Sequence, residues 1–551
     1  MNRTDEGDTV NGDGAERWYV TTAIPYVNAR PHIGFALEAV LTDALARHHR
    51  LRGDDTRALT GTDENSLKNV QAAESEGVPT KELVDRYAEA FRDLEGALDL
   101  SFDDFIRTSA EARHLEGVRR LWEACEASGD VYKQPYEGLY CVGCEVFYTE
   151  DELEDGLCPE HKTPPELVRE ENYFFRLSKY QDQLLDLIES GRLEIVPETR
   201  RNEVLSFVRA GLRDFSISRS TERAHGWGVP VPGDPEQVMY VWFDALGNYI
   251  TALGYADDGD LYERYWVGNP SRVHVIGKGI TRFHAVYWPA MLLSAGVPLP
   301  TTIFVHGYVT IGGDKISKSL GNVIDPVTLA EEYGSEALRY YLLREIRSTH
   351  DGDFTIERFV RTHNAHLADQ LGNLLSRTTG MIERYFDGRI PAPGVPDERD
   401  RALIELADGL AGRVDDAVER FATHEALGEI WSVLEAANKY VVEVEPWALA
   451  KRRDDPDVEA RLATALYVLA EVLRVVAQLL QAFLPRTADE LARRLSFELS
   501  PDDVLVAARW GGTVPGTAVE RGAVLFPKLE LPPEGNGADA LSHADEGSEA
   551  D

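Results

Sequence analysis

The sequence predicts an α/β fold in which a doubly wound parallel sheet is followed by an α-helical bundle. The first observation is a strand at residues 18–23, followed by a helix from about Ile33 to Leu51 and a second strand near 56–60. The second is that this strand–helix–strand rhythm returns further along the chain. The third is that strand signals fade after about Phe359. Alternating strands and helices are typical of a parallel sheet with helices on both faces.

The second half of the predicted sheet comes from a strand at 273–277, a helix over 283–295 and a strand at 301–305. A long insertion that holds most of the cysteines separates the two halves. Beyond the sheet, helical periodicity continues to about Arg494, which predicts a bundle. Residues 522–527 are expected to form a closing strand or an extended segment.

The charge balance is extreme for a chain of 551 residues, because 95 acidic and 57 basic residues give a formal net charge of −38. Nucleic-acid-binding proteins normally lean basic. An acidic excess spread along the whole chain suits a halophilic cytoplasm, where acidic side chains keep a protein hydrated and salt screens their repulsion. An acidic protein of an ordinary cytoplasm is the alternative. In the high-salt case, net charge says little about RNA binding.

Other features predict a soluble, cytoplasmic protein of two or more domains. Four cysteines in so long a chain argue against a disulfide-stapled secreted protein, and residues 1–16 lack an apolar signal core. The most apolar stretch, 462–484, is interrupted at spacings of three and four, which favours a bundle helix over a membrane span. The interrupting residues are Glu471, Arg474, Gln478 and Gln481.

Two short strings predict a nucleotide site. In the first, His32 and Gly34 stand where a strand turns into a helix, so free backbone N–H groups and the helix dipole attract phosphate. Gly34 lets the backbone approach a nucleotide, and His32 can donate to a phosphate oxygen. In the second, a glycine loop precedes Lys315 and Lys318, whose ammonium groups can stabilise charge on a triphosphate. A plain helix start and a solvated basic turn are the alternatives.

The pattern Cys141-x2-Cys144-x13-Cys158-x2-His161 has the spacing of a zinc knuckle. Two short ligand pairs supply three thiolates and one imidazole to a tetrahedral ion, which predicts one structural Zn2+. Thiols clustered by accident are the alternative. Cys125 lies outside the pattern and is expected to be buried or inert.

The strings at 31–35 and 315–319 resemble the HIGH and KMSKS signatures of class I aminoacyl-tRNA synthetases. Further blocks narrow the resemblance to methionyl-tRNA synthetases over nearly the whole chain: residues 23–28, 60–64, 140–144, 214–219, 240–245, 288–292 and 445–447. The resemblance implies a Rossmann-type catalytic domain, an inserted zinc-knuckle connective domain and an α-helical anticodon-binding bundle. It also implies that ATP with Mg2+ activates methionine to methionyl-adenylate, which is transferred to tRNA(Met), with no DNA or membrane partner.

The resemblance also implies a set of nucleotide-binding residues and a methionine pocket. Catalysis is expected from His32, Lys315 and Lys318, and ATP binding from His32, Gly34, Lys278, His306, Lys315, Ser317 and Lys318. The expected methionine pocket consists of Ile24, Tyr26, Asp63, Trp242, Ala245, Tyr249, Ile280, His284 and Trp288. Asp63 can pair with the substrate ammonium, and rings can enclose a thioether. Ordinary core packing is the alternative for any one of these aromatic residues.

A third implied set lies in the helical region and would read the anticodon CAU. Asn373 and Arg377 are spaced i, i+4 and share a helix face, and Trp447 follows a proline at a helix start. Amide and guanidinium groups can bind base edges while an indole stacks on an unstacked base. Such contacts survive high salt better than phosphate pairing. A surface Asn/Arg pair and a packed tryptophan are the alternatives.

The chain departs from the family pattern at positions expected near ATP. Phe35 replaces the second histidine of the first signature, Asn65-Ser66 replaces His-Gly, and Gly279 replaces an aspartate. Phe35 offers no hydrogen bond, and one lost transition-state donor costs about 10²–10³ in rate. Two explanations stay open. A working ligase compensates with other donors, namely Arg219, Lys278 or His306. Alternatively, a paralogue with weakened or redirected nucleotide chemistry binds tRNA or methionine, or acylates another acceptor.

The expected domain ranges follow from these motifs. They are a disordered acidic N-terminus (1–16), the first half of the catalytic domain (17–117), the connective insertion with the zinc knuckle (118–230), the second half with the lysine loop (231–355), the helical anticodon-binding domain (356–500), a closing segment (501–531) and a disordered acidic tail (532–551).

Overall fold

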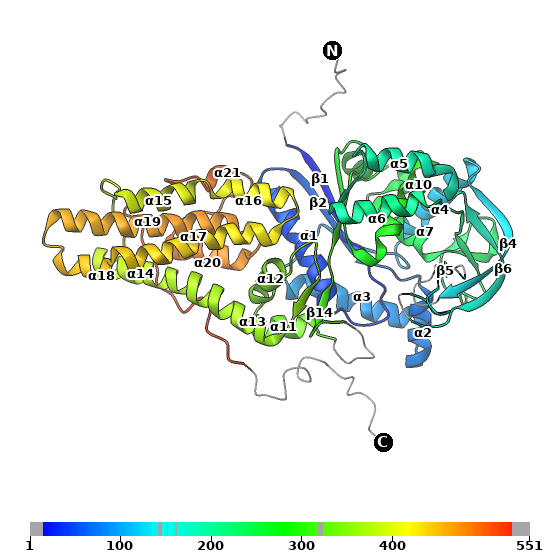
Figure 1. The fold of residues 1–551 in the computed structure, drawn as a ribbon, viewed down its shortest axis with the longest axis horizontal. Helices are drawn as coiled ribbons and strands as arrows, with labels where there is room; N and C mark the ends of the chain where they lie inside the picture. Colours follow the sequence, from blue (N-terminus) through cyan, green and yellow to red (C-terminus); the bar gives the residue numbers. More distant parts are fainter. Residues whose placement is uncertain are drawn as a thin grey trace, which may run out of the picture.

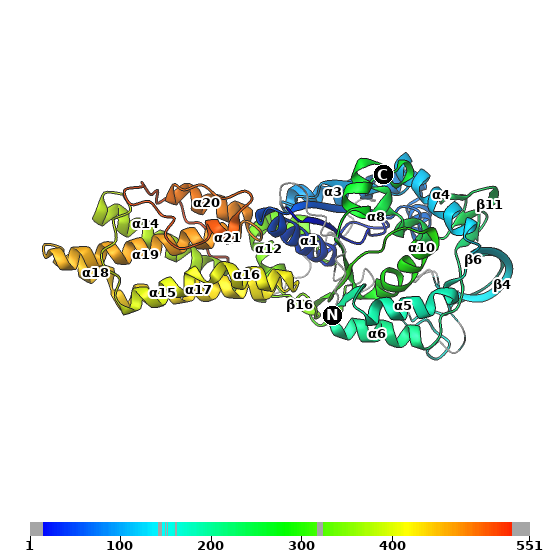
Figure 2. The same cartoon turned by 90° about the horizontal axis from the view of Figure 1, so that it is seen from above.

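The computed structural model describes residues 15–141, 146–148, 150, 153–159, 162–316 and 323–531. The molecule is elongated, with a helical bundle at one end, an antiparallel sheet at the other and the parallel strands between them (Figures 1 and 2). The predicted disordered ends, 1–16 and 532–551, fall almost entirely outside the described residues.

The central sheet is parallel throughout, in the order β3-β2-β1-β12-β13-β7. Its strands are β1 (Arg17–Thr21), β2 (Asp55–Thr62), β3 (Asp104–Arg107), β7 (Glu194–Val196), β12 (Ser271–Gly277) and β13 (Thr302–His306). The order reverses between β1 and β12, and in such sheets ligands bind beyond the carboxyl ends of the strands at that point. The predicted doubly wound sheet is therefore confirmed.

Alternate residues of β1 face two different cores. Val20 packs in a cluster that includes residues of α1 and α12, whereas Tyr19 packs in a cluster that includes residues of α4 and α10. Helices thus cover both faces of the sheet, as alternation in a buried strand requires. The helices of this half are α1 (Ile33–Leu51), α2 (Leu67–Glu76), α3 (Thr80–Ala97), α4 (Ala112–Ala127), α5 (Gln181–Glu189), α6 (Glu198–Arg209), α7 (Val241–Leu246), α8 (Asn248–Thr251), α9 (Asp260–Tyr262), α10 (Trp288–Ala295), α11 (Pro326–Tyr333) and α12 (Ser335–Arg344).

The insertion between β3 and β12 forms small antiparallel sheets. One has the order β5-β4-β6-β8, built from β4 (Val131–Cys141), β5 (Val146–Tyr148), β6 (Glu166–Phe175) and β8 (Phe215–Ser216). A second has the order β10-β11-β9, built from β9 (Ser218–Ser220), β10 (Pro230–Val231) and β11 (Asp234–Met239). The segment expected to be wholly insertion, 118–230, also supplies β7, the edge strand of the parallel sheet.

Short helical turns join these elements. They are the 3₁₀ turns η2 (Leu177–Tyr180), η3 (Tyr255–Asp257) and η5 (Lys278–Ile280) and the π turns η4 (Glu263–Val267) and η6 (Phe283–Tyr287). The predicted helix at 283–295 is thus a π turn that continues into α10.

The C-terminal half is a helical bundle, as predicted. It contains α13 (Ile356–Thr362), η8 (His363–Gly372), α14 (Asn373–Phe386), α15 (Glu398–Asp408), α16 (Leu410–Glu419), α17 (Thr423–Val444), α18 (Pro446–Leu449), η9 (Ala450–Arg452), α19 (Pro456–Leu480), α20 (Pro485–Leu495) and α21 (Val504–Ala507). Within the described residues, only α19 is long and apolar enough to cross a membrane, and its apolar window is entirely buried in the structure.

The polar residues that interrupt α19 hold the C-terminal segment in place. Glu471 and Arg474 form a buried ion pair at 2.7 Å. The Glu471 carboxylate accepts the N–H groups of residues 511–513, and the Arg474 guanidinium donates to the carbonyls of Ala507 and Arg509. Residues 522–527 contain no strand and form an irregular segment with bends, and the carbonyl of Pro527 lies 2.9 Å from Nε2 of His363. The closing strand expected at 522–527 is therefore not formed, because bends interrupt the segment.

Helix α1 joins the two halves of the molecule. Near its middle, Asp43 pairs with Arg339 of α12 at 2.8 Å, and both side chains are fully buried. At its end, Nε2 of His48 lies 2.8 Å from Asp415 of α16. The helix that begins at His32 therefore ends against the bundle (Figure 2).

Candidate active site

The structure brings the two signature strings together. A side-chain carbon placed on Gly34 would lie 3.9 Å from Cδ1 of Ile316. The N–H of Ile33 donates to the carbonyl of Ile324 at 3.0 Å, so the chain that follows the second string contacts the start of α1. Ser317 and Lys318 lie outside the described residues, and Lys315 is described by its backbone alone.

His32 is the N-cap of α1, and its Nδ1 accepts the N–H of Gly34 at 3.0 Å. Burial lowers the pKa of His32 to about 4, so the ring is neutral near pH 7. Because Nδ1 accepts, the single proton of the neutral ring sits on Nε2, which is a donor. A side-chain carbon on Gly34 would lie 2.8 Å from Cε1 of His32, so any larger residue at that position would force the histidine ring to shift.

Phe35 is partly buried and packs against neighbouring rings. Its ring stacks on His32 with centroids 4.3 Å apart and meets the edge of Phe91 of α3 at 5.3 Å. The rings of Phe35 and Phe91 line a pocket that Glu38 and Glu95 also line. The replacement therefore contributes packing beside His32 and no hydrogen bond.

The glycine loop is a tight hairpin between β14 (Val309–Ile311) and β15 (Asp314–Lys315). Gly312 and Gly313 have φ of 62° and 88°, a conformation that other residues rarely adopt. Asp353 in β16 (Gly352–Phe354) accepts the N–H of Gly313 at 2.8 Å and the hydroxyl of Thr310 at 2.9 Å. The base of the lysine loop is thereby fastened to the neighbouring strand.

Each of the three expected compensating donors has a partner inside the protein. His306 is buried, with Nε2 2.7 Å from Glu38 and Nδ1 2.7 Å from the carbonyl of Gly307. Lys278 pairs with Asp351 at 2.5 Å. Arg219 is buried and donates to the carbonyl of Ser218 at 2.7 Å. Only Lys278 is partly exposed, in an ion pair of the weak surface type that phosphate can replace.

On the opposite side of the site, Tyr249 and His284 form a directed hydrogen-bond chain. Nδ1 of His284 donates to the carbonyl of Ile280 at 3.0 Å, so Nε2 accepts from the Tyr249 hydroxyl at 2.7 Å. Burial lowers the pKa of His284 to about 4 and raises that of Tyr249. The pair is therefore neutral and held in one orientation.

His274 was missed at the sequence level. Its Nε2 accepts the indole N–H of Trp288 at 3.3 Å, its Nδ1 lies 2.8 Å from the Thr21 hydroxyl, and its ring lies 4.0 Å from that of Tyr249. Burial lowers its pKa well below the usual value. The available signal was a histidine inside an otherwise apolar strand.

The remaining pocket residues gather around Trp242. Its ring stacks on Phe283 at 3.8 Å and meets the edges of Tyr26 at 6.5 Å and His284 at 6.2 Å. Ile24 and Ile280 are half-buried in the same core cluster, and Ala245 is buried on α7. The structure thus brings the expected aromatic residues together.

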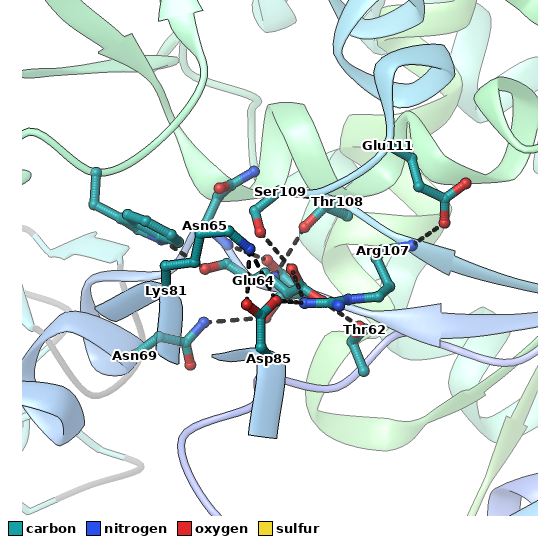
Figure 3. A network of polar contacts seen from close by, with 12 residues as sticks. Thr62, Glu64, Asn65, Asn69, Lys81, Asp85, Arg107, Thr108, Ser109 and Glu111 are labelled. Atoms are coloured by element: carbon teal, nitrogen blue, oxygen red, sulfur yellow. Dashed lines mark hydrogen bonds and ion pairs between the residues drawn. The ribbon is translucent and has the colours of Figure 1, made fainter. Parts of the chain in front are cut away.

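Asp63 directly follows β2 and is buried, and its backbone forms an isolated parallel β-bridge with Tyr26. The next carboxylate, Glu64, accepts from Arg107 at 2.6 Å, from the Thr62 hydroxyl at 2.8 Å and from Ser109. Arg107 also binds Asp85 at 2.6 Å, and, against the effect of burial, hydrogen bonds from Lys81 and Arg107 lower the pKa of Asp85 (Figure 3). Glu64 is thus fully used in anchoring the loop.

The other departures from the family pattern also make structural contacts. The Asn65 amide donates to Asp244 at 2.7 Å, and the Ser66 hydroxyl caps α2 by accepting the N–H of Lys68 at 3.0 Å. Gly279 lies exposed in the turn η5.

Two of the four expected zinc ligands can be described. Cys141 ends β4 and is buried, and Cys158 is buried in a turn closed by its N–H to the carbonyl of Thr163 at 2.9 Å. Sγ of Cys158 lies 3.7 Å from the hydroxyl of Tyr148 on β5, the strand paired with Cys141. Cys144 and His161 lie outside the described residues, and the described ones contain no group of three metal-ligating side chains. Cys125 is buried, as expected.

The three residues expected to read the anticodon are surface residues of the bundle. Asn373 and Arg377 are exposed on α14, and the Asn373 amide donates to Asp369 at 3.1 Å. Trp447 on α18 is 41% exposed, too much for a core tryptophan. The structure does not bring these residues near the nucleotide site, because α14 and α18 belong to the bundle end of the molecule (Figure 1).

Comparison with known proteins agrees with this geometry. The family model "tRNA synthetases class I (M)" matches residues 18–164 and 152–379, and the model "Anticodon binding domain of methionyl tRNA ligase" matches residues 390–533. The methionine–tRNA ligase of Brucella suis is 49% identical over 505 residues, covering 90% of this chain and 96% of its own. That of Mycobacterium bovis is 47% identical over 525 residues, covering 94% and 99%.

Solved structures give the same result. Mycobacterium tuberculosis methionyl-tRNA synthetase in complex with methionyl-adenylate matches with a TM-score of 0.89 at 46% identity, covering 93% of this chain and 100% of that one. Its apo form matches with a TM-score of 0.83 at 43% identity, covering 94% and 99%. This chain therefore belongs to the methionyl-tRNA synthetases, a family of class I aminoacyl-tRNA synthetases.

Proposed function

We propose that this chain activates methionine with ATP to methionyl-adenylate and transfers the methionyl group to tRNA(Met). The observation that carries the proposal is that the two signature strings lie close together: a side-chain carbon placed on Gly34 would lie 3.9 Å from Cδ1 of Ile316. The order of the parallel sheet reverses between β1 and β12, which is where such sheets bind ligands. The family match over nearly the whole chain supports the same activity.

Activation is an in-line attack of the methionine carboxylate on the α-phosphorus of ATP. The new O–P bond gives methionyl-adenylate, and the bond to the β-phosphate oxygen breaks to release pyrophosphate. Neither this step nor the transfer requires a dedicated protein base, so positioning and charge stabilisation carry the catalysis. Mg2+ accompanies ATP and supplies positive charge to its phosphates.

The protein groups proposed for this step surround the start of α1. His32 offers its Nε2–H to a phosphate oxygen, because Nδ1 is already occupied. Gly34 leaves room for the nucleotide, and Lys315, Ser317 and Lys318 contribute from the loop that follows the glycine hairpin. Lys278 can exchange Asp351 for phosphate. His306 acts indirectly by holding Glu38, whose other oxygen accepts the N–H of Ala23 at 2.8 Å.

Methionine is proposed to bind between Asp63 and the aromatic pocket. The Asp63 carboxylate pairs with the substrate ammonium. The thioether side chain carries no hydrogen-bonding group, so it suits a wall of rings in which Tyr249, His284 and His274 have their polar atoms hydrogen-bonded within the protein. The Tyr249–His284 chain and the His274–Trp288 contact provide that wall.

Recognition of tRNA is proposed for the exposed surface of the bundle, where Asn373, Arg377 and Trp447 would read the anticodon. Trp447→Ala removes a stacking surface worth about 1–3 kcal/mol per base. We expect aminoacylation of tRNA to fall about 10- to 100-fold while methionine-dependent ATP–pyrophosphate exchange is unchanged. Equal loss of both activities would assign Trp447 to folding of the bundle.

The connective region is proposed to hold one structural zinc ion through Cys141, Cys144, Cys158 and His161. The two described ligands fit, because the turn of Cys158 lies against the hairpin strand that pairs with Cys141. Thiolate and imidazole ligands that leave no open position suit a structural role. Elemental analysis of the purified protein should give one zinc per chain.

We also propose that the protein is soluble, cytoplasmic and adapted to high salt, on the basis of its net charge of −38. The ranges given above for the catalytic halves, the insertion and the bundle are proposed as its domains.

The deciding experiment is methionine-dependent ATP–pyrophosphate exchange in molar KCl, followed by charging of initiator and elongator methionine tRNAs. The proposal predicts both activities. A folded protein that binds methionine but supports no exchange would refute it. Exchange without tRNA charging would show that the acceptor is another molecule.

A further inference from the structure

The loop after β2 is tied to two different parts of the catalytic half by successive side chains. Glu64 points toward β3 and α3, where Arg107 holds it at 2.6 Å (Figure 3). Its own carbonyl accepts the indole N–H of Trp227 at 2.7 Å. The next residue, Asn65, points the other way and donates its amide to Oδ2 of Asp244 at 2.7 Å.

Asp244 is completely buried and has a second donor. Nε2 of His114 on α4 donates to its Oδ1 at 2.7 Å, and Nδ1 of His114 lies 2.8 Å from the hydroxyl of Thr251. Among its described contacts, Asp244 thus has one donor for each carboxylate oxygen. A buried carboxylate oxygen that loses its donor is costly, so the helix carrying it must shift or water must enter.

The position of Asp244 gives this contact a consequence for the substrate. Asp244 lies on α7 between Trp242 and Ala245, two residues proposed to enclose the thioether. Asn65 lies two residues after Asp63, proposed to bind the ammonium. The hydrogen bond therefore spans the two ends of the methionine site, and Glu64 fixes the loop from the other side.

We propose that Asn65 and Asp244 are positioning residues for methionine, and that their hydrogen bond sets the distance between Asp63 and the wall formed by α7. This inference rests on the proposed function and adds to it. It places Asn65 in amino-acid binding rather than in nucleotide chemistry. An imidazole N–H can make the same contact, so histidine at this position serves equally well.

The test compares Asn65→Ala, Asn65→His and Asp244→Asn with a matched control, Asn269→Ala. Asn269 is also a buried asparagine, but its amide donates to the carbonyl of Tyr265 in a loop before β12. Steady-state exchange gives the KM for methionine and for ATP separately, and thermal melting reports stability.

We expect Asn65→Ala to raise the KM for methionine about tenfold, which is the effect of losing one hydrogen bond to a charged group. The KM for ATP should stay within about twofold of the parent value. The KM of Asn65→His for methionine should lie within about threefold of the parent value. Asp244→Asn should resemble Asn65→Ala, because its amide cannot accept at both positions. Asn269→Ala should lower the melting temperature without changing either KM.

Equal changes in both KM values, or a loss of stability alone as in the control, would overturn the inference. Failure of the proposed function is a separate outcome, since the parent would then show no exchange. Titration calorimetry with methionine alone would still test the inference in that case. Unchanged methionine affinity in Asn65→Ala would refute it.

Discussion

The methionine side and the nucleotide side of the proposed site differ in how their polar groups are satisfied. On the methionine side, the hydroxyl of Tyr249 and both ring nitrogens of His284 and His274 are hydrogen-bonded within the protein. On the nucleotide side, Phe35 and Gly279 offer no side-chain donor, and His32 offers one N–H. The methionine side suits its substrate, because a thioether needs a closed apolar wall. On the nucleotide side, the absence of donors at Phe35 and Gly279 leaves His32 as the side chain at the start of α1 that can donate to a phosphate oxygen.

The largest expected effect tests the nucleotide side at His32. Because Phe35 supplies no donor, His32→Ala removes the N–H that the start of α1 directs at phosphate. We expect exchange to fall about 10²- to 10³-fold while methionine affinity changes less than twofold. A fall of less than tenfold, or a parallel loss of methionine affinity, would break the contrast between the two sides.

The second prediction concerns pH and the methionine side. Burial lowers the pKa of His284 to about 4, whereas an unfolded histidine titrates near 6.5. Between these values the unfolded state binds the additional proton, so stability falls as pH drops from 6.5 toward 4. The full shift corresponds to about 3 kcal/mol.

Urea unfolding at pH 7.5, 5.5 and 4.5 in constant salt measures this loss. His284→Asn serves as the control, because it removes one titrating ring and should give a shallower pH dependence than the parent. The same slope in both proteins would show that His284 is not held neutral. The remaining slope in the variant reports the other histidines of depressed pKa, such as His32 and His274.

The smallest expected effect comes from Phe35→His, which restores a ring with a donor beside His32. We expect exchange to rise by about 2- to 10-fold, the value of one net hydrogen bond. In the parent protein, the phenyl ring of Phe35 packs on His32 and Phe91. Because the substitution loses part of this packing, the free energy of unfolding should fall by about 1 kcal/mol. Phe35→Leu removes the ring without adding a donor and should show no gain. Equal rates in the His and Leu variants would mean that position 35 does not face phosphate.

Much of the fold could be predicted because local patterns carry it. The predicted bounds of α1, Ile33 to Leu51, agree with the structure because a glycine-containing turn and a long amphipathic pattern define them. The edge strand β7 could not be predicted, because three residues between helices carry too little pattern to show that they pair with β13. The position of β7 in the sheet is decided by its pairing with β13, which lies more than one hundred residues further along the chain.

Within the site, the residue types were readable but their partners were not. His306, Lys278 and Arg219 were expected as spare donors, and the structure engages each of them in the protein. Asn65 was expected near ATP, and it donates to Asp244 across 179 positions of sequence. Such pairings depend on where distant elements pack, which no local spacing encodes.

The sequence by itself determined the doubly wound sheet, the helical bundle and the family, because strand–helix rhythm and short signature strings are local properties of the chain. Only the tertiary structure decided which side chains are free to meet a substrate. A donor's availability depends on its partners in space. The three-dimensional packing therefore turned Phe35 from a lost ligand into a packing residue, and Asn65 from a nucleotide-site replacement into a contact of α7.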